Sequence, residues 1–112
     1  MSSEHEEQKG LITWFRLKYP SILIFAIPNG SYRDISTAKK LKREGVTKGI
    51  PDLYIPKIHC WVEMKTVDGG KLSEEQLAMH RYLRMIGDEV IIGAGATDAS
   101  IQILNVMKKH NL

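Results

Sequence analysis

The sequence lacks the features that define several protein classes. Its 112 residues include one cysteine, Cys60, so an intramolecular disulfide is excluded. No apolar run approaches the roughly 18 residues that suggest a membrane span, and the acidic start MSSEHEEQKG lacks the apolar stretch of a signal peptide. We therefore expect a soluble protein of a reducing, intracellular compartment, without a membrane partner.

Repeats, low-complexity tracts and linkers rich in Pro, Gly or Ser are also absent. The chain is 43% hydrophobic and 26% charged, which is typical of a globular domain. At this length roughly two-thirds of the unfolded surface is buried on folding, which suffices for one core. We therefore expect residues 1–112 to form a single domain.

Two kinds of cofactor site are not expected. His5, His59, His80, His110 and Cys60 lack the paired spacing of zinc ligands. Too little chain follows residues 93–95, which read Gly-Ala-Gly, for a dinucleotide-binding βαβ unit. We expect neither structural zinc nor a nicotinamide cofactor.

Positive charge is concentrated in one segment of a chain whose net charge is +3. Between residues 39 and 48, one acid, Glu44, is outnumbered by Lys39, Lys40, Lys42, Arg43 and Lys48. Such a run suits the phosphate backbone of a nucleic acid. It is also common on solvated helix faces, and the residues alone leave both interpretations open.

Hydrophobic spacing and turn residues predict an alternation of helices and strands. We expect helices at about 4–19, 35–44, 73–85 and 98–108, and strands at 21–27, 52–55, 59–66 and 89–92. The strand at 21–27 should be buried, and the next two should form a hairpin. Ser73 and Gln76 have the spacing of a capping box. This order predicts an α/β fold with a mixed sheet covered by helices.

An acid and a base share one face of the strand at 59–66. Because side chains alternate along a strand, Cys60, Val62 and Met64 face one way and Trp61, Glu63 and Lys65 the other. Burying Glu63 and Lys65 is costly unless they have a use there. This is the first functional signal in the sequence.

Asp52 interrupts the apolar pattern of the preceding strand, directly after Pro51. If the two strands pair, Asp52 and Glu63 converge and offer two oxygen ligands for Mg²⁺ or Mn²⁺ beside a lysine. Such a set suits phosphate chemistry. A cross-strand ion pair, with Asp52 as a turn residue, accounts for the same residues without a function.

The residues Pro51-Asp52 and Glu63-Met64-Lys65 resemble the core of PD-(D/E)xK nucleases, and their flanks narrow the resemblance to the VRR-NUC family. The flanks are Asn29-Gly30, Arg33, residues 40–46, residues 48–53, residues 70–76 and His80. The resemblance extends from about Glu4 to Val106. It implies a restriction-endonuclease-like α/β core with a mixed central sheet, and metal-dependent hydrolysis of DNA phosphodiester bonds.

The resemblance also implies roles for individual residues. Asp52 and Glu63 would bind Mg²⁺ or Mn²⁺, the Met64 backbone carbonyl would add an oxygen, and Lys65 would be the catalytic lysine. Gln76 resembles a glutamine near the site, although the capping box is an equally good role for it. Family members also tend to carry an acid on the first helix. Glu4 is our first choice and Glu7 the second.

The expected partner is DNA. We expect it to contact Arg33, Lys39, Lys40, Lys42, Arg43, Lys48 and Lys71. Trp61 could stack on a base, although a strand tryptophan is more often part of a core or interface. The rival interpretation is a non-catalytic DNA-binding module built on the basic helix at 35–45, because residues 37–46 also read like the start of a helix-turn-helix. The strands that follow argue against this rival.

The expected assembly is a homodimer. Stand-alone VRR-NUC proteins, which the chain resembles, occur in phages and imply this arrangement. A two-fold symmetric four-way (Holliday) junction is naturally matched by a C₂ dimer with one active site for each of two strands. The expected location is the cytoplasm of a bacterium or of a phage-infected host cell.

Overall fold

The computed structural model describes residues 2–28 and 34–112, and contains an α/β fold with a mixed sheet. The helices are α1 (Glu4–Lys18), α2 (Ile35–Arg43), α3 (Glu74–Met85) and α4 (Ala96–Lys109), with a short 3₁₀ helix η1 (Pro56–Ile58). The strands are β1 (Phe25–Ala26), β2 (Leu53–Ile55), β3 (Cys60–Lys65) and β4 (Glu89–Ala94). The predicted order of helices and strands is confirmed.

The sheet has the order β1-β2-β3-β4. β2 is antiparallel to both β1 and β3, and η1 connects the predicted hairpin of β2 and β3. β3 and β4 are parallel, with Glu63 opposite Ile92, and α3 forms the crossover between them that parallel strands require. The predicted mixed sheet is confirmed.

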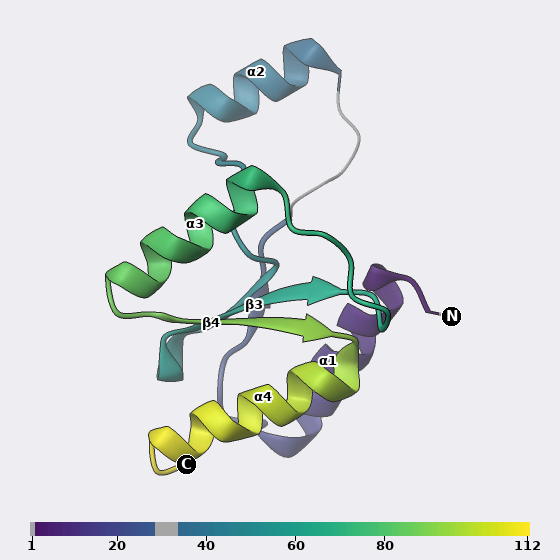
Figure 1. Cartoon of the computed structure of the whole chain (residues 1–112), viewed down its shortest axis with the longest axis vertical. Coiled ribbons are helices and arrows are strands. Elements are labelled where there is room, and N and C mark those ends of the chain that lie inside the picture. Colours follow the sequence, from purple (N-terminus) through teal and green to yellow (C-terminus); the bar gives the residue numbers. More distant parts are fainter. Residues whose placement is uncertain (1, 29–33) are drawn as a thin grey trace.

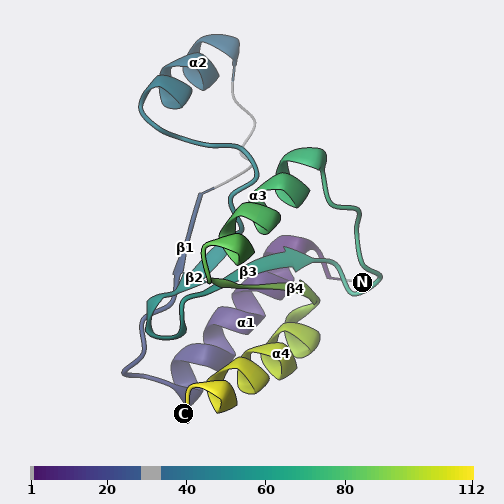
Figure 2. The ribbon, with the colours of Figure 1, turned by 60° about the vertical axis from the view of Figure 1, so that its left-hand side comes forward.

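Helices cover both faces of the sheet (Figure 1). α1 and α4 lie side by side on one face, and α3 lies on the other (Figure 2). The apolar residues of β3 point into the core, which they form together with α1 and α4. The core residues include Leu11, Phe15, Val62, Met64 and Ile103. Phe15 is fully buried, so its replacement by alanine would cost about 3–5 kcal/mol. The predicted alternation along β3 is confirmed.

α4 begins earlier than the sequence indicates, at Ala96 instead of Asp98. Its N-cap is Gly95, which has no side chain to cap the helix. Instead, Glu7 of α1 accepts a hydrogen bond from the Ala96 backbone N–H at 2.8 Å, while Asp98 accepts one from Ala94 N–H. The cap comes from a residue distant in sequence, which local pattern does not reveal.

The prediction of a buried strand at 21–27 is wrong. Only β1 is a strand in this region, and both of its residues are exposed at the edge of the sheet. Ile24 enters the core, but Leu23 is exposed. An apolar run alone does not distinguish a central strand from an edge segment that anchors one side chain.

α2 stands apart from the rest of the molecule (Figure 1) and has no buried residue. Its ends are capped locally: Asp34 accepts a hydrogen bond from the Thr37 backbone N–H at 2.6 Å, and Gly45 follows the helix with φ of +101°. The predicted helix and its glycine are confirmed. Within the described parts of the chain, no helix is both long and apolar enough to cross a membrane.

Candidate active site

Asp52 is held where β2 and β3 diverge. Its Oδ2 accepts a hydrogen bond from the Met64 backbone N–H at 2.7 Å. The preceding loop packs against α3 at Gly49, which has φ of +88° and where an added Cβ would lie 2.4 Å from the Glu75 carbonyl oxygen. Pro51, buried, then restricts the backbone that leads into Asp52. The loop and β3 together fix the carboxylate.

Glu63 is a buried acid on β3, facing α3, with 1% of its surface exposed. Its Oε1 is 2.9 Å from His80 Nε2, and its Oε2 accepts a hydrogen bond from Gln76 Nε2 at 3.2 Å. Burial, followed by the neighbouring Asp52 carboxylate, raises the pKa of Glu63 to about 8. Asp52 and Glu63 are therefore neighbouring acids in a poorly solvated part of the protein.

His80 is the partner of Glu63 that the sequence did not assign a role. Burial, followed by the charges of Arg84 and Lys65, lowers the pKa of His80. Its Nδ1 is buried and has no hydrogen-bond partner among the described residues. We assign a neutral imidazole that donates from Nε2 to Glu63, because an unpaired lone pair is better tolerated than an unpaired N–H. The available signal was spacing: His80 lies four residues after Gln76, on the same helix face.

Gln76 connects the acid to the lysine. Its Oε1 accepts hydrogen bonds from Ser73 backbone N–H at 2.9 Å and from Lys65 Nζ at 3.4 Å, while its Nε2 reaches Glu63. Ser73 Oγ in turn accepts from Gln76 N–H, which confirms the predicted capping box. Lys65 is 7% exposed. One side chain therefore closes the capping box and also contacts both Glu63 and Lys65.

The two candidate acids of α1 lie in different surroundings. Glu4 is exposed, and its charge is among the influences that raise the pKa of Glu63. Glu7 is bound to Ala96, and this bond, followed by one from Ser2, lowers the pKa of Glu7. Since Glu7 caps α4, Glu4 is the acid that we retain for the site.

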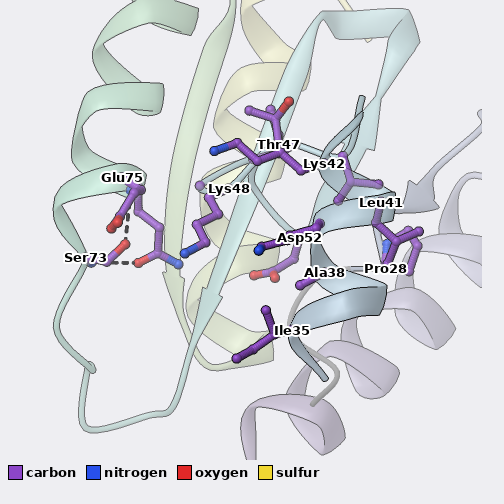
Figure 3. Close-up of a pocket in the computed structure, with 15 residues that line it drawn as sticks. Pro28, Ile35, Ala38, Leu41, Lys42, Thr47, Lys48, Asp52, Ser73 and Glu75 are labelled. Carbon is purple, nitrogen blue, oxygen red and sulfur yellow. Dashed lines mark hydrogen bonds between the residues drawn. The ribbon is translucent and has the colours of Figure 1, made fainter. Parts of the chain in front are cut away.

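A cleft of about 1050 Å³ opens over Asp52, between α2 and the N-terminal end of α3. Figure 3 shows Ile35 and Ala38 of α2 on one side, Ser73 and Glu75 on the other, and Asp52 between them. Of the residues expected to contact DNA, the cleft is lined by Lys39, Lys42 and Lys48. Lys40, Arg43 and Lys71 are exposed but do not line it, and Arg33 lies outside the described residues.

The donors available to a metal ion are limited. Among the described residues, no group of three or more His, Cys, Asp or Glu side chains is arranged to hold a metal. The candidate set is therefore two carboxylates, Asp52 and Glu63, with a main-chain oxygen. The Met64 carbonyl suits this role because a strand residue directs its N–H and C=O to the same edge, and its N–H is bound to Asp52.

Trp61 lies on the same face of β3 as Glu63 but has partners of its own. Its Nε1–H donates to Asp88 Oδ2 at 2.9 Å, and its ring centroid is 4.2 Å from that of Tyr54. Phe25 continues the row, with its ring centroid 5.9 Å from Tyr54. These contacts give Trp61 a structural role.

No protein-family model and no curated protein matches the sequence. A solved structure described as a "VRR_NUC domain protein" is similar, with a TM-score of 0.79 over 96% of this chain and 90% of that one. The identity is 22%, so the likeness concerns the fold. The fold and the site thus define an α/β protein with an acid-rich centre, Asp52 and Glu63, at the inner strands β2 and β3 of a mixed sheet. That fold is shared with a VRR_NUC domain, as the sequence resemblance predicts.

Proposed function

We propose that the chain is a metal-dependent endonuclease that hydrolyses phosphodiester bonds of DNA. The observation that carries this proposal is the part-buried connection Glu63–Gln76–Lys65, next to Asp52, which reaches the cleft at Gln76. Buried ionisable groups are costly, and their gathering in a cleft is typical of functional sites. The fold shared with a VRR_NUC domain protein supports the same conclusion.

Asp52, Glu63 and the Met64 carbonyl would hold Mg²⁺ or Mn²⁺. Glu4 is the acid of α1 that we propose to join them when the ion is bound, since the described residues do not already group three acids. The donor set fits, because both ions prefer oxygen ligands, and neither carboxylate forms an ion pair with Lys or Arg among the described residues. When bound, the ion would polarise the phosphodiester and lower the pKa of a water molecule.

We propose Lys65 as the group that acts on the reacting phosphate. Its ammonium is held by Gln76, two residues along the strand from Glu63, and would stabilise negative charge on the phosphate oxygens or orient the attacking water. His80 and Gln76 hold both oxygens of Glu63, which keeps that carboxylate in one orientation. Lys65→Ala would therefore impair hydrolysis more than metal binding.

The test is incubation of purified protein with supercoiled plasmid DNA in Mg²⁺, Mn²⁺ or EDTA. We expect nicked and linear products in the metal-containing samples alone, and none with Glu63→Gln. DNA binding without metal-dependent nicks would support the rival, a DNA-binding module that uses the basic helix α2. Against this rival, α2 is followed by β2 and not by a second helix of a helix-turn-helix.

The proposal extends to assembly and substrate. We propose a homodimer that cuts branched DNA, with the four-way junction as its preferred form. One chain offers one acid-rich centre, whereas a junction presents two strands related by two-fold symmetry. The exposed edge strand β1 and its neighbour Leu23 are surfaces that a second copy would cover.

A further inference from the structure

The cations of α2 divide into two pairs. Lys39 and Lys42 line the cleft, whereas Lys40 and Arg43, which are equally exposed, do not. Spacings of three, four and seven residues bring side chains to one face of a helix, so Lys39 and Lys42 lie on the same face as Ile35. α2 therefore presents half of its charge to the cleft and half to open solvent.

The same face of α2 is also apolar. Ile35, Ala38 and Leu41 line the cleft together with the two lysines, and Ile35 is 75% exposed although it is a large aliphatic residue. Val46, in the loop after α2, extends this surface and is 50% exposed. Exposed apolar residues gathered on one wall of a cleft mark a surface that a ligand covers.

The rest of the cleft lining includes two residues of the proposed site, Asp52 and Gln76. Asp52 lies at the junction of the two walls, with Lys48 extending beside it (Figure 3). A ligand in this cleft would therefore meet lysines, a strip of aliphatic side chains and the proposed catalytic acid. Phosphate groups would pair with the lysines, and the faces of nucleobases would pack against the aliphatic side chains.

We infer that the cleft holds a single unpaired DNA strand, with its bases against the apolar face of α2 and a phosphate beside Asp52. A closed duplex hides the faces of its bases inside the stack, so it offers no base face to Ile35 and Leu41. Unpaired nucleotides expose both backbone and base faces, as in grooves that bind single strands. The inference rests on the proposed nuclease function and specifies the form of its substrate.

The first experiment compares two pairs of substitutions with equal charge. Lys39→Gln with Lys42→Gln removes the two α2 cations that line the cleft and leaves Lys48, and Lys40→Gln with Arg43→Gln removes the other two cations of α2. Binding of a labelled single strand of about 12 nucleotides is measured by anisotropy in EDTA, so that nothing is cut. The plot of log affinity against log salt concentration has a negative slope. Loss of two phosphate contacts would reduce the magnitude of this slope by about 1.4, at about 0.7 per contact.

We expect this change in slope for the cleft pair and a smaller one for the control pair. An equal loss of slope in both pairs would overturn the inference, because the strand would then be held by general attraction to α2. An unchanged slope in the cleft pair would overturn it as well.

The second experiment removes the apolar strip. Ile35→Ser with Leu41→Ser leaves the charge unchanged, and α2 has no buried residue, so the body of the fold is not expected to unfold. Circular dichroism checks that α2 persists. We expect affinity for the single strand to fall about fivefold, without a change in salt slope. This is near the low end of the range for bases stacked on aromatic side chains, because Ile35 and Leu41 are aliphatic. Affinity for a blunt duplex should not change.

Equal effects on the single strand and the duplex, or no effect on either, would overturn the inference. Conversion of a dimer to a monomer in the serine variant, with unchanged affinity for the strand, would instead assign the cleft to a second copy. These binding measurements need no cleavage. If the plasmid assay shows no nicking while the strand still binds through the cleft face of α2, the nuclease proposal fails and the binding inference stands.

Discussion

The carboxyl group of Glu63 lies in the protein interior. We expect its replacement to reduce activity but not stability. Asp52→Asn and Glu63→Gln remove charge from the proposed metal ligands with little change in volume. We expect each to reduce plasmid cleavage at least 100-fold, a loss of about 3 kcal/mol or more of transition-state stabilisation. Quantified nicking rates in Mg²⁺ give the measurement.

The stability of these variants separates a functional acid from a structural one. Burial and the Asp52 carboxylate raise the pKa of Glu63, so its ionised form is disfavoured in the fold. A neutral amide in its place would remove the charge and keep one acceptor oxygen for Gln76 or His80, at the loss of the other hydrogen bond. We expect Glu63→Gln to melt at the same or a higher temperature than the parent protein. Glu74→Gln, an exposed acid at the start of α3, is the matched control. Near-normal cleavage by Glu63→Gln, with contaminating nuclease excluded, would contradict the site.

At the scale of the element, sequence predicts those parts of the site that depend on local rules. The alternation along β3 placed Glu63 and Lys65 on one face, and the Ser73–Gln76 spacing placed the start of α3. The connection from Glu63 to His80 depends on how α3 lies across β3, and no local pattern contains that distance. For the same reason the sequence missed the cap that Glu7 provides for α4.

The loop before β2 allows a prediction about how Asp52 is positioned. Gly49→Ala would place a Cβ against the Glu75 carbonyl and force a non-glycine residue to keep a positive φ. We expect a loss of about 1–3 kcal/mol in the free energy of unfolding, with reduced cleavage because the loop and Asp52 must shift. Urea denaturation and nicking rates measure the two effects.

Gly45→Ala is the control for this loop. Gly45 also has a positive φ, +101°, but an added Cβ there would meet nothing within 4 Å. It should therefore show the backbone strain without the contact to α3, and cleavage should be less affected than in Gly49→Ala. Equal cleavage losses in the two variants would show that contact between the loop and α3 does not position Asp52.

The link between α1 and α4 predicts a dependence of stability on pH. Because the pKa of Glu7 is lowered from 4.5 by the Ala96 N–H, its contribution is present above the unfolded-state pKa. It is lost as the pH falls through the lower pKa of the folded state. We expect Glu7→Gln to lower the melting temperature at neutral pH, and the difference from the parent protein to shrink below about pH 4.5.

Melting curves from neutral to acidic pH measure this difference. Glu44→Gln, an exposed acid at the end of α2, is the control and should produce no such pH-dependent difference. A gap between Glu7→Gln and the parent protein that persists at low pH would mean that the Glu7 charge does not stabilise the start of α4.

At the scale of the whole molecule, the position of α2 could not be predicted from the sequence. Its residues predict the helix and its charge, but not that it stands off the body and leaves a cleft above Asp52 (Figure 1). With no buried residue, α2 has little packing of its own to fix it there. A helix placed this way needs another component, and DNA or a second copy of the chain are the two components that the proposed function supplies.

Assembly gives the last prediction, because the number of active sites decides what a junction nuclease can cut. We expect a homodimer at micromolar concentration, with two acid-rich centres for the two strands of a four-way junction. Light scattering measures the mass, and a mass of one chain would contradict the dimer. Cleavage of a mobile junction is then compared with that of a linear duplex built from the same arms. We expect faster cutting of the junction, because its two-fold symmetry matches that of the dimer, and equal rates would exclude junction selectivity.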